Sequence, residues 1–181
     1  MIESKISKRY ARALMSIGKE DHKYAIYGEN LCEFAMLCKE NKEFFGVISN
    51  NIFSLEDRIV IIDKVLEKNN FEIVVNNFLR LLILKGRINA IVEISEYYSI
   101  LVDEVNNITR AVLSSPNALK VKVKERLLAA LEKFTGKIII IVEKQNKALI
   151  GGVVVKIGDL VIDGSIRTQL VRLTELLKRG R

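Results

Sequence analysis

Few side chains in this sequence could carry out chemistry at a catalytic or metal site. Its 181 residues include one histidine, His22, and two cysteines, Cys32 and Cys38. A metal site built from several imidazoles is therefore excluded, and a Ser-His-Asp or Cys-His pair would depend on His22 alone. We expect His22, within Asp21-His22-Lys23, to occupy a solvated position on a helix.

The two cysteines lie six positions apart in a segment with helical periodicity. A rise of about 1.5 Å per residue separates them by roughly 9 Å, which is too far for a disulfide bond within one helix. Two further metal ligands at suitable spacing are absent nearby. We therefore expect small buried thiols and no metal.

No motif for phosphate or nucleotide binding is present. The sequence has no Gly-Lys-Ser/Thr loop, and Gly151-Gly152 is followed by three valines rather than by a third glycine that opens a helix. Asp163-Gly164-Ser165 before the last helix could bind an anion through free backbone N–H groups, although ordinary helix capping explains it more simply. We expect no catalytic residue, no cofactor and no enzymatic activity.

Residues 1–106 have helical periodicity throughout. Ser54 with Asp57 predicts a capped helix start, and Gly86 predicts a left-handed helix end. No strand pattern interrupts the stripes, so five to six helices in a compact bundle are predicted. The expected core stripes of the first two helices are Ile6, Tyr10, Ala13, Leu14 and Ile17, then Tyr24, Tyr27, Leu31, Phe34, Ala35 and Cys38.

Residues 107–181 predict a small α+β domain. Residues 108–113 alternate in part, and Pro116 ends that strand. A helix stripe that includes Leu127, Leu131 and Phe134 stops at Gly136, and the branched run 138–142 predicts a central strand covered on both faces. The fold class is α+β overall, with an all-α bundle followed by a domain that has a β-hairpin and a carboxy-terminal helix.

The hairpin turns at Gly158-Asp159, where glycine supplies a positive φ. A two-residue turn places Ile157 opposite Leu160 and Val155 opposite Ile162, so the apolar pairs share one face. Ser165 is a natural cap for the last helix, whose stripe is Ile166, Leu170, Leu173 and Leu177.

The two halves of the chain also differ in charge. Residues 1–106 carry 14 Lys and Arg against 16 Asp and Glu, whereas residues 107–181 carry 15 against 6. A basic second half indicates an acidic protein partner, an anionic surface or nucleic acid. Because its single aromatic residue, Phe134, falls on the apolar stripe, nucleic-acid binding is retained only as the alternative function.

The residues resemble a known family along the whole chain. The stretches 150–155 and 158–165, followed by Arg167, Leu170, Arg172 and Leu173, closely resemble the carboxy-terminal signature of bacterial F-type ATP synthase delta subunits and of the mitochondrial oligomycin-sensitivity-conferring protein. The stretches 9–14, 78–82 and 85–87 resemble the family's opening helix and its late-bundle motif. Departures are local, at Lys147-Ala148 and Thr168-Gln169.

The resemblance implies a mechanical role without catalysis. Residues 1–106 would hold the amino-terminal helix of an alpha subunit, and residues 107–181 would engage the peripheral-stalk b subunits. The chain would link the catalytic hexamer to the stalk against rotor torque. It would lie at the cytoplasmic face of the bacterial membrane and contact the membrane only through the complex.

The site residues follow from the matched motifs. The expected groove for the alpha-subunit helix combines the first and fifth helices, although each of its residues could instead belong to the core; its residues are Tyr10, Ala11, Ala13, Leu14, Phe78, Leu81 and Leu82. Leu81 is the most informative because it lies off the main stripe of its helix. The residues expected to form turns and the hairpin are Gly151, Gly152, Gly158, Asp159, Asp163, Gly164 and Ser165.

Overall fold

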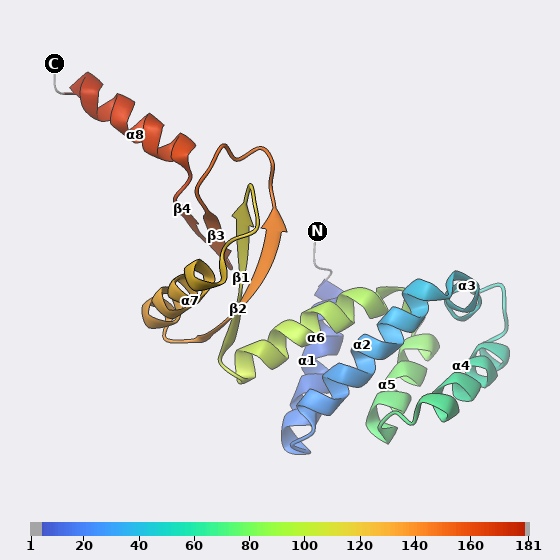
Figure 1. Ribbon diagram of the computed structural model, residues 1–181. Coiled ribbons are helices and arrows are strands. Elements are labelled where there is room, and N and C mark those ends of the chain that lie inside the picture. Colours follow the sequence, from blue (N-terminus) through green and yellow to red (C-terminus); the bar gives the residue numbers. More distant parts are fainter. Residues whose placement is uncertain (1–4, 180–181) are drawn as a thin grey trace. The chain divides into compact units, whose positions relative to one another are not determined.

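A computed structural model describes residues 5–179 of the chain. The chain divides between Val102 and Asp103 into two compact units, the first helical and the second mixed. This arrangement confirms the predicted fold class, a helical bundle followed by a small α+β domain (Figure 1).

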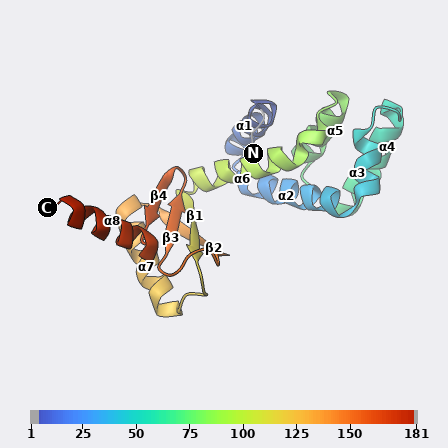
Figure 2. The same cartoon turned by 90° about the horizontal axis from the view of Figure 1, so that it is seen from above.

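From residue 5 onward, the first unit is built from six α-helices and one short 3-10 helix. Their bounds are α1 Lys5–Glu20, α2 Tyr24–Glu40, α3 Lys42–Ser49, α4 Leu55–Asn69, α5 Ile73–Leu84, η1 Ile88–Ala90 and α6 Ile91–Val105. Side chains from every one of these elements meet in a single core, whose largest members include Tyr27, Phe34 and Tyr98. Figure 2 shows α1 and α5 on the same side of α2 and α6.

Two predicted helix boundaries are confirmed. The Ser54 hydroxyl accepts a hydrogen bond from the Asp57 backbone N–H at 3.1 Å, so it caps α4. Farther along the chain, Gly86 has a φ of 62° and follows the last turn of α5. The N–H groups of Gly86 and Arg87 then bond the carbonyls of Ile83 and Leu82, which closes the end of the helix.

The buried face of α1 differs from the predicted stripe. It consists of Ser7, Ala11, Leu14, Met15 and Gly18, whereas Tyr10 is half-buried and Ala13 and Ile17 are exposed. Close packing explains the small residues, because a Cβ added to Gly18 would lie 2.9 Å from the Tyr24 Cα. The Ser7 hydroxyl also donates to Glu93 Oε2 at 2.8 Å, which satisfies its buried polar group.

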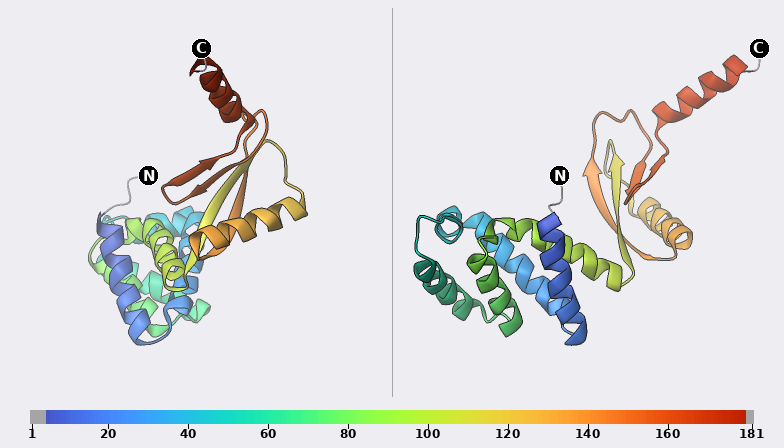
Figure 3. Two further views of the ribbon diagram at one scale, coloured as in Figure 1. Left: turned by 90° about the vertical axis from the view of Figure 1, so that its left-hand side faces the viewer. Right: turned by 180° about the vertical axis from the view of Figure 1, so that it is seen from behind.

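The second unit contains a four-stranded sheet with the order β2-β1-β3-β4. Its elements are β1 Ile108–Ser115, α7 Val121–Thr135, β2 Ile138–Gln145, β3 Val154–Ile157, β4 Leu160–Asp163 and α8 Ile166–Arg179. Strands β1 and β2 are parallel and are joined through α7, whereas β3 pairs antiparallel with both β1 and β4. Figure 3 shows α7 lying along the sheet and α8 extending away from it.

The hairpin register is confirmed. Val155 lies opposite Ile162 and Ile157 opposite Leu160, and the turn between them contains Gly158 with a φ of 56°. Val155 and Ile157 are buried with Ala111, Leu113 and Ile139 beneath Leu131 of α7.

Two expectations for this unit are wrong. The run 138–142 forms an edge strand rather than a central one, because β1 occupies the middle of the sheet. Only the face that holds Ile139 and Ile141 packs against the core, and Ile138, Ile140 and Val142 are exposed. Phe134 is 69% exposed instead of lying on the buried side of α7, where Leu127, Leu128 and Leu131 make the contact with the sheet.

Helix α8 carries its predicted apolar stripe but does not bury it. Ile166, Leu170, Leu173 and Leu177 are between 42% and 77% exposed. Across residues 5–179, no helix combines the length and the hydrophobicity needed to cross a membrane.

Candidate docking surfaces

The single histidine of the sequence lies in a turn. His22 is exposed in the turn between α1 and α2 with a φ of 56°, so the expectation of a solvated residue is confirmed and that of a helical position is wrong. The turn closes through a bond from the Lys23 N–H to the Gly18 carbonyl, which requires the chain to leave the helical conformation at His22.

The two cysteines differ in burial. Both are free; Cys38 is buried as expected, whereas Cys32 is half-buried. Burial raises the pKa of the Cys38 thiol to about 12, so this side chain stays protonated and is a poor nucleophile or ligand at neutral pH. Within residues 5–179, His, Cys, Asp and Glu side chains form no group of three or more that could hold a metal ion.

The segment Asp163-Gly164-Ser165 forms a helix cap whose polar groups already have partners. The Ser165 Oγ accepts from the Thr168 N–H at 3.3 Å, and Asp163 Oδ1 accepts from the Ser165 N–H at 2.8 Å. The Thr168 hydroxyl donates to Asp163 Oδ2 at 2.8 Å. These bonds hold the pKa of the Asp163 carboxyl below its usual value, with the bond from the Ser165 N–H as the largest cause.

Gly151 and Gly152 let the chain pass close to this cap. Gly152 has a φ of 83°, and a Cβ there would lie 2.4 Å from the Gly164 carbonyl oxygen. A Cβ on Gly151 would lie 2.5 Å from the Ile166 side chain. The N–H groups of Gly164 and Ile166 bond the carbonyls of Val153 and Gly151, so the double glycine fixes the point from which α8 leaves the sheet.

The expected groove residues of the first unit divide between core and surface. Ala11, Leu14 and Leu82 are almost completely buried, and Phe78 is 8% exposed. Tyr10 is half-buried, whereas Ala13 is exposed and Leu81 is 40% exposed. The expected groove residues that reach the surface are therefore Tyr10, Ala13 and Leu81.

Helices α1 and α5 lie side by side and antiparallel. The rings of Tyr10 and Phe78 meet edge to face with centroids 6.3 Å apart. Ile6, at the start of α1, borders the same depression of about 300 Å³ as Gly86, just after the end of α5. Figure 1 shows the two helices running in opposite directions, and Figure 2 shows them on the same side of α2.

This pair presents a row of apolar side chains that the bundle does not cover. We call it the α1–α5 face, and its residues are Tyr10, Ala13, Ile17, Ile73, Leu81 and Leu84. Ile17, Ile73 and Leu84 were not among the expected groove residues. For α5, the sequence pattern could have indicated an exposed apolar face. Ile73, Leu81 and Leu84 share one side of the helix, and Ile73 and Leu84 lie off the stripe that forms the core.

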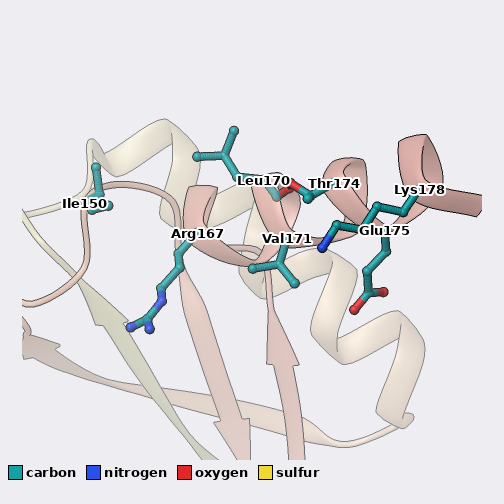
Figure 4. A pocket seen from close by; sticks show the side chains of 7 residues that line it. All are labelled: Ile150, Arg167, Leu170, Val171, Thr174, Glu175 and Lys178. Atoms are coloured by element: carbon teal, nitrogen blue, oxygen red, sulfur yellow. The ribbon is translucent and has the colours of Figure 1, made fainter.

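The second unit has its own uncovered surface along α8. A groove of about 370 Å³ is lined by Ile150, from the connection between β2 and β3, and by one side of α8 (Figure 4). Its α8 residues are Arg167, Leu170, Val171, Thr174, Glu175 and Lys178. Figure 4 shows the Leu170 side chain extending from α8 toward Ile150. Apolar side chains form the middle of this groove, and charged side chains frame it.

Comparison with known proteins identifies relatives that all belong to one family. The family model "ATP synthase delta (OSCP) subunit" matches residues 6–177. An ATP synthase subunit delta of Desulfatibacillum aliphaticivorans is 42% identical over 176 residues, which cover 97% of this chain and 96% of the relative. The corresponding subunit of Desulfosudis oleivorans is 42% identical over 175 residues, with the same coverage.

A solved structure shares the fold. A chain in the mitochondrial ATP synthase hexamer of Toxoplasma gondii superposes with a TM-score of 0.72 at 16% identity, over 96% of this chain and 98% of that chain. The sequence matches extend from the first helix to the last and include both units. The chain therefore belongs to the ATP synthase delta (OSCP) subunit family and is a structural, non-catalytic subunit of the stator.

Proposed function

We propose that this subunit links the alpha/beta hexamer of an F-type ATP synthase to the b subunits of the peripheral stalk. The first unit binds the amino-terminal helix of an alpha subunit, and the second unit binds the stalk. The hexamer then resists the torque of the rotor during ion-driven ATP synthesis. The complex lies at the cytoplasmic face of a bacterial membrane, which this chain contacts only through other subunits.

The observation that carries the proposal is the α1–α5 face. Two antiparallel helices in edge-to-face contact through Tyr10 and Phe78 present a row of apolar side chains along both axes. An amphipathic helix binds such a row by placing its apolar residues between the two helices. Ala13 has a small side chain and is exposed, so the backbone of a guest helix can approach α1 closely at this position.

The bundle can present this face without losing its own stability. Leu82 and Phe78 anchor α5 in the core, whereas Leu81 on the same helix points outward. The ion pair between Arg80 and Asp63, with Nε and Oδ1 2.7 Å apart, ties α5 to α4. The outward side chains are therefore held on a rigid support, which reduces the entropy lost when a partner binds.

Isothermal titration calorimetry tests this assignment. A peptide with the amino-terminal sequence of the cognate alpha subunit is titrated into the full chain and into Leu81→Asp. Because a carboxylate would be buried without a partner, we expect Leu81→Asp to weaken binding at least about tenfold. Val60→Asp on α4 is the matched control, since Val60 is also exposed and lies on another helix.

Two results would contradict the assignment. One is the absence of peptide binding to the unaltered chain at tens of micromolar, which corresponds to an interaction weaker than about −6 kcal/mol. The other is equal binding by the unaltered chain and Leu81→Asp, which would place the alpha subunit on a different surface. Circular dichroism of both variants checks that the helices are intact.

A further inference from the structure

The exposed stripe of α8 has the spacing of a coiled-coil seam. Ile166, Leu170, Leu173 and Leu177 follow one another at intervals of four, three and four residues. This is the alternation of a and d positions in a heptad repeat, and it continues over almost the whole helix. The four side chains are exposed, so the described part of the second unit leaves the seam uncovered.

The seam is held in a defined position at its first turn. The Asp163–Ser165 cap and the contacts of Gly151 and Gly152 fix the start of α8. Beyond this turn the helix extends away from the sheet (Figure 3). Helix α8 is therefore ready to receive a second helix along its length.

Charges along α8 indicate the chemistry of that second helix. Arg167, Arg172 and Lys178 are exposed on it, and Glu175 is its only carboxylate. The whole of residues 107–181 carries 15 Lys and Arg against 6 Asp and Glu. An approaching helix with acidic residues beside its apolar seam would meet opposite charge, whereas a basic helix would be repelled.

The groove beside the seam adds a place for an anchoring side chain. Leu170 belongs both to the seam and to the groove of about 370 Å³, where it lies beside Val171 and across from Ile150 (Figure 4). Arg167 and Lys178 stand toward its two ends. An apolar side chain that enters the groove would meet two cations and one carboxylate, Glu175, and this net positive charge suits a residue with acidic neighbours in the partner.

We propose that α8 binds the stalk by forming a short coiled coil with an acidic helix that carries a matching heptad repeat. Leu170 and Leu173 form its centre, and Arg167, at the e position that follows Ile166, pairs with a carboxylate of the partner. The proposal rests on the proposed function for the identity of the partner as a stalk b subunit. It adds that α8 makes the contact, that the two helices pack through a heptad repeat, and that the partner's charge is acidic.

The test uses the full chain and the soluble, membrane-free part of the cognate b subunits. Binding is measured by calorimetry for the unaltered chain, for Leu173→Asp and for Val121→Asp. Leu173 and Val121 are both exposed, and Val121 opens α7, away from the seam. We expect Leu173→Asp to weaken binding at least about tenfold and Val121→Asp to change it less than about twofold.

A covalent probe locates the contact independently. A photoreactive benzophenone side chain at position 173 should cross-link to the b subunits, whereas the same group at position 121 should not. Charge reversal by Arg167→Glu should also weaken binding, and this loss should shrink at high salt because the pair is exposed to solvent.

The possible outcomes separate the two claims. If the unaltered chain binds the stalk and Leu173→Asp binds equally well, the coiled-coil proposal is overturned and the proposed function stands. If the unaltered chain does not bind the stalk, both fail. Equal losses in Leu173→Asp and Val121→Asp would place the contact elsewhere in the second unit. Binding to anionic lipid vesicles that needs Leu173, without any effect on stalk binding, would assign the seam to a membrane surface instead.

Discussion

At the scale of single residues, the junction between the sheet and α8 depends on a glycine at a position with no room for a side chain. Gly152 combines a positive φ with a backbone contact that leaves no room for a Cβ. Gly136, at the end of α7, has a similar φ of 67°, but a Cβ added there would meet no atom within 4 Å. A comparison of the two glycines therefore separates the cost of a left-handed backbone conformation from the cost of a close backbone contact.

Replacing each of these glycines by alanine should give different losses of stability. Gly136→Ala should lower the free energy of unfolding by about 1 kcal/mol, the cost of a left-handed conformation. Gly152→Ala should lower it by about 3 kcal/mol or more, because the Gly164 carbonyl must also move. Urea unfolding followed by circular dichroism measures both. Equal losses would show that the close approach at Gly152 contributes nothing.

Asp163 gives the cap a defined dependence on pH. Its folded-state pKa is lowered by bonds from Ser165 and Thr168, so its contribution to stability is fully present above the ordinary value of 3.8. That contribution is lost as the pH falls through the folded pKa. We expect the unaltered chain to lose more stability than Asp163→Asn between neutral pH and about pH 2.5. Parallel loss in the two proteins, measured by urea unfolding, would show that the carboxylate is not stabilised by the cap.

At the scale of elements, adjacent residues of α5 have different roles, one in the stability of the fold and the other in binding. Leu82 is fully buried, whereas its neighbour Leu81 is 40% exposed. Leu82→Ala should lower the free energy of unfolding by about 2 to 5 kcal/mol through the cavity it leaves. Leu81→Ala should cost less than about 1 kcal/mol and act mainly on affinity for the alpha-subunit peptide. A large stability loss in Leu81→Ala would assign this residue to the core.

Element type and order could be predicted from periodicity, but the side of an element that becomes buried could not always be predicted. In α1 the most apolar stripe was expected inside. The bundle buries Leu14 of that stripe as expected, but beside it and Met15 it buries Ser7, Ala11 and Gly18, because small residues let α1 approach α2 and α6 closely. Hydrophobicity ranks side chains by their transfer from water, and it does not register how closely two backbones can pack.

The edge position of β2 could not be predicted from the sequence for a related reason. A run of branched residues is compatible with burial on both faces, and the sequence does not say how many helices are available to cover them. Here α7 covers the face of Ile139 and Ile141, and the second face stays exposed. The hairpin was predicted in full register because its determinants, the turn and the alternation, are local.

The candidate docking residues show the same limit. Family motifs brought α1 and α5 together correctly, as the contact between Tyr10 and Phe78 shows. They did not separate Ala11, Leu14 and Leu82, which are core, from Ala13 and Leu81, which are accessible. That distinction depends on the rotation of each helix in the bundle, which is set by contacts far apart in the sequence.

At the scale of the whole molecule, the unequal distribution of charge should produce unequal salt dependence. The second half carries the large basic excess and the first half is nearly balanced. Raising the ionic strength from about 0.05 M to 0.5 M should therefore weaken stalk binding by about tenfold and alpha-peptide binding by less than about threefold. Calorimetry at the two salt concentrations measures both. Equal salt dependence would mean that charge does not distinguish the two interfaces.

The same excess of charge underlay the alternative of nucleic-acid binding. Membership of the ATP synthase delta (OSCP) subunit family accounts for the basic half without it, since a stator subunit requires protein partners. On α8, basic side chains stand beside exposed leucines, and the single aromatic residue of residues 107–181, Phe134, is exposed on another helix, α7. This combination suits an acidic protein helix better than it suits exposed bases.

The central claim is that one chain holds the hexamer and the stalk at the same time, and one titration tests it most directly. The soluble part of the cognate b subunits is titrated into the full chain, first alone and then with the chain saturated by the alpha-subunit peptide. We predict a complex that contains all three components, with stalk affinities that agree within about twofold. Displacement of the peptide by the stalk, or failure to form the three-component complex, would contradict the claim.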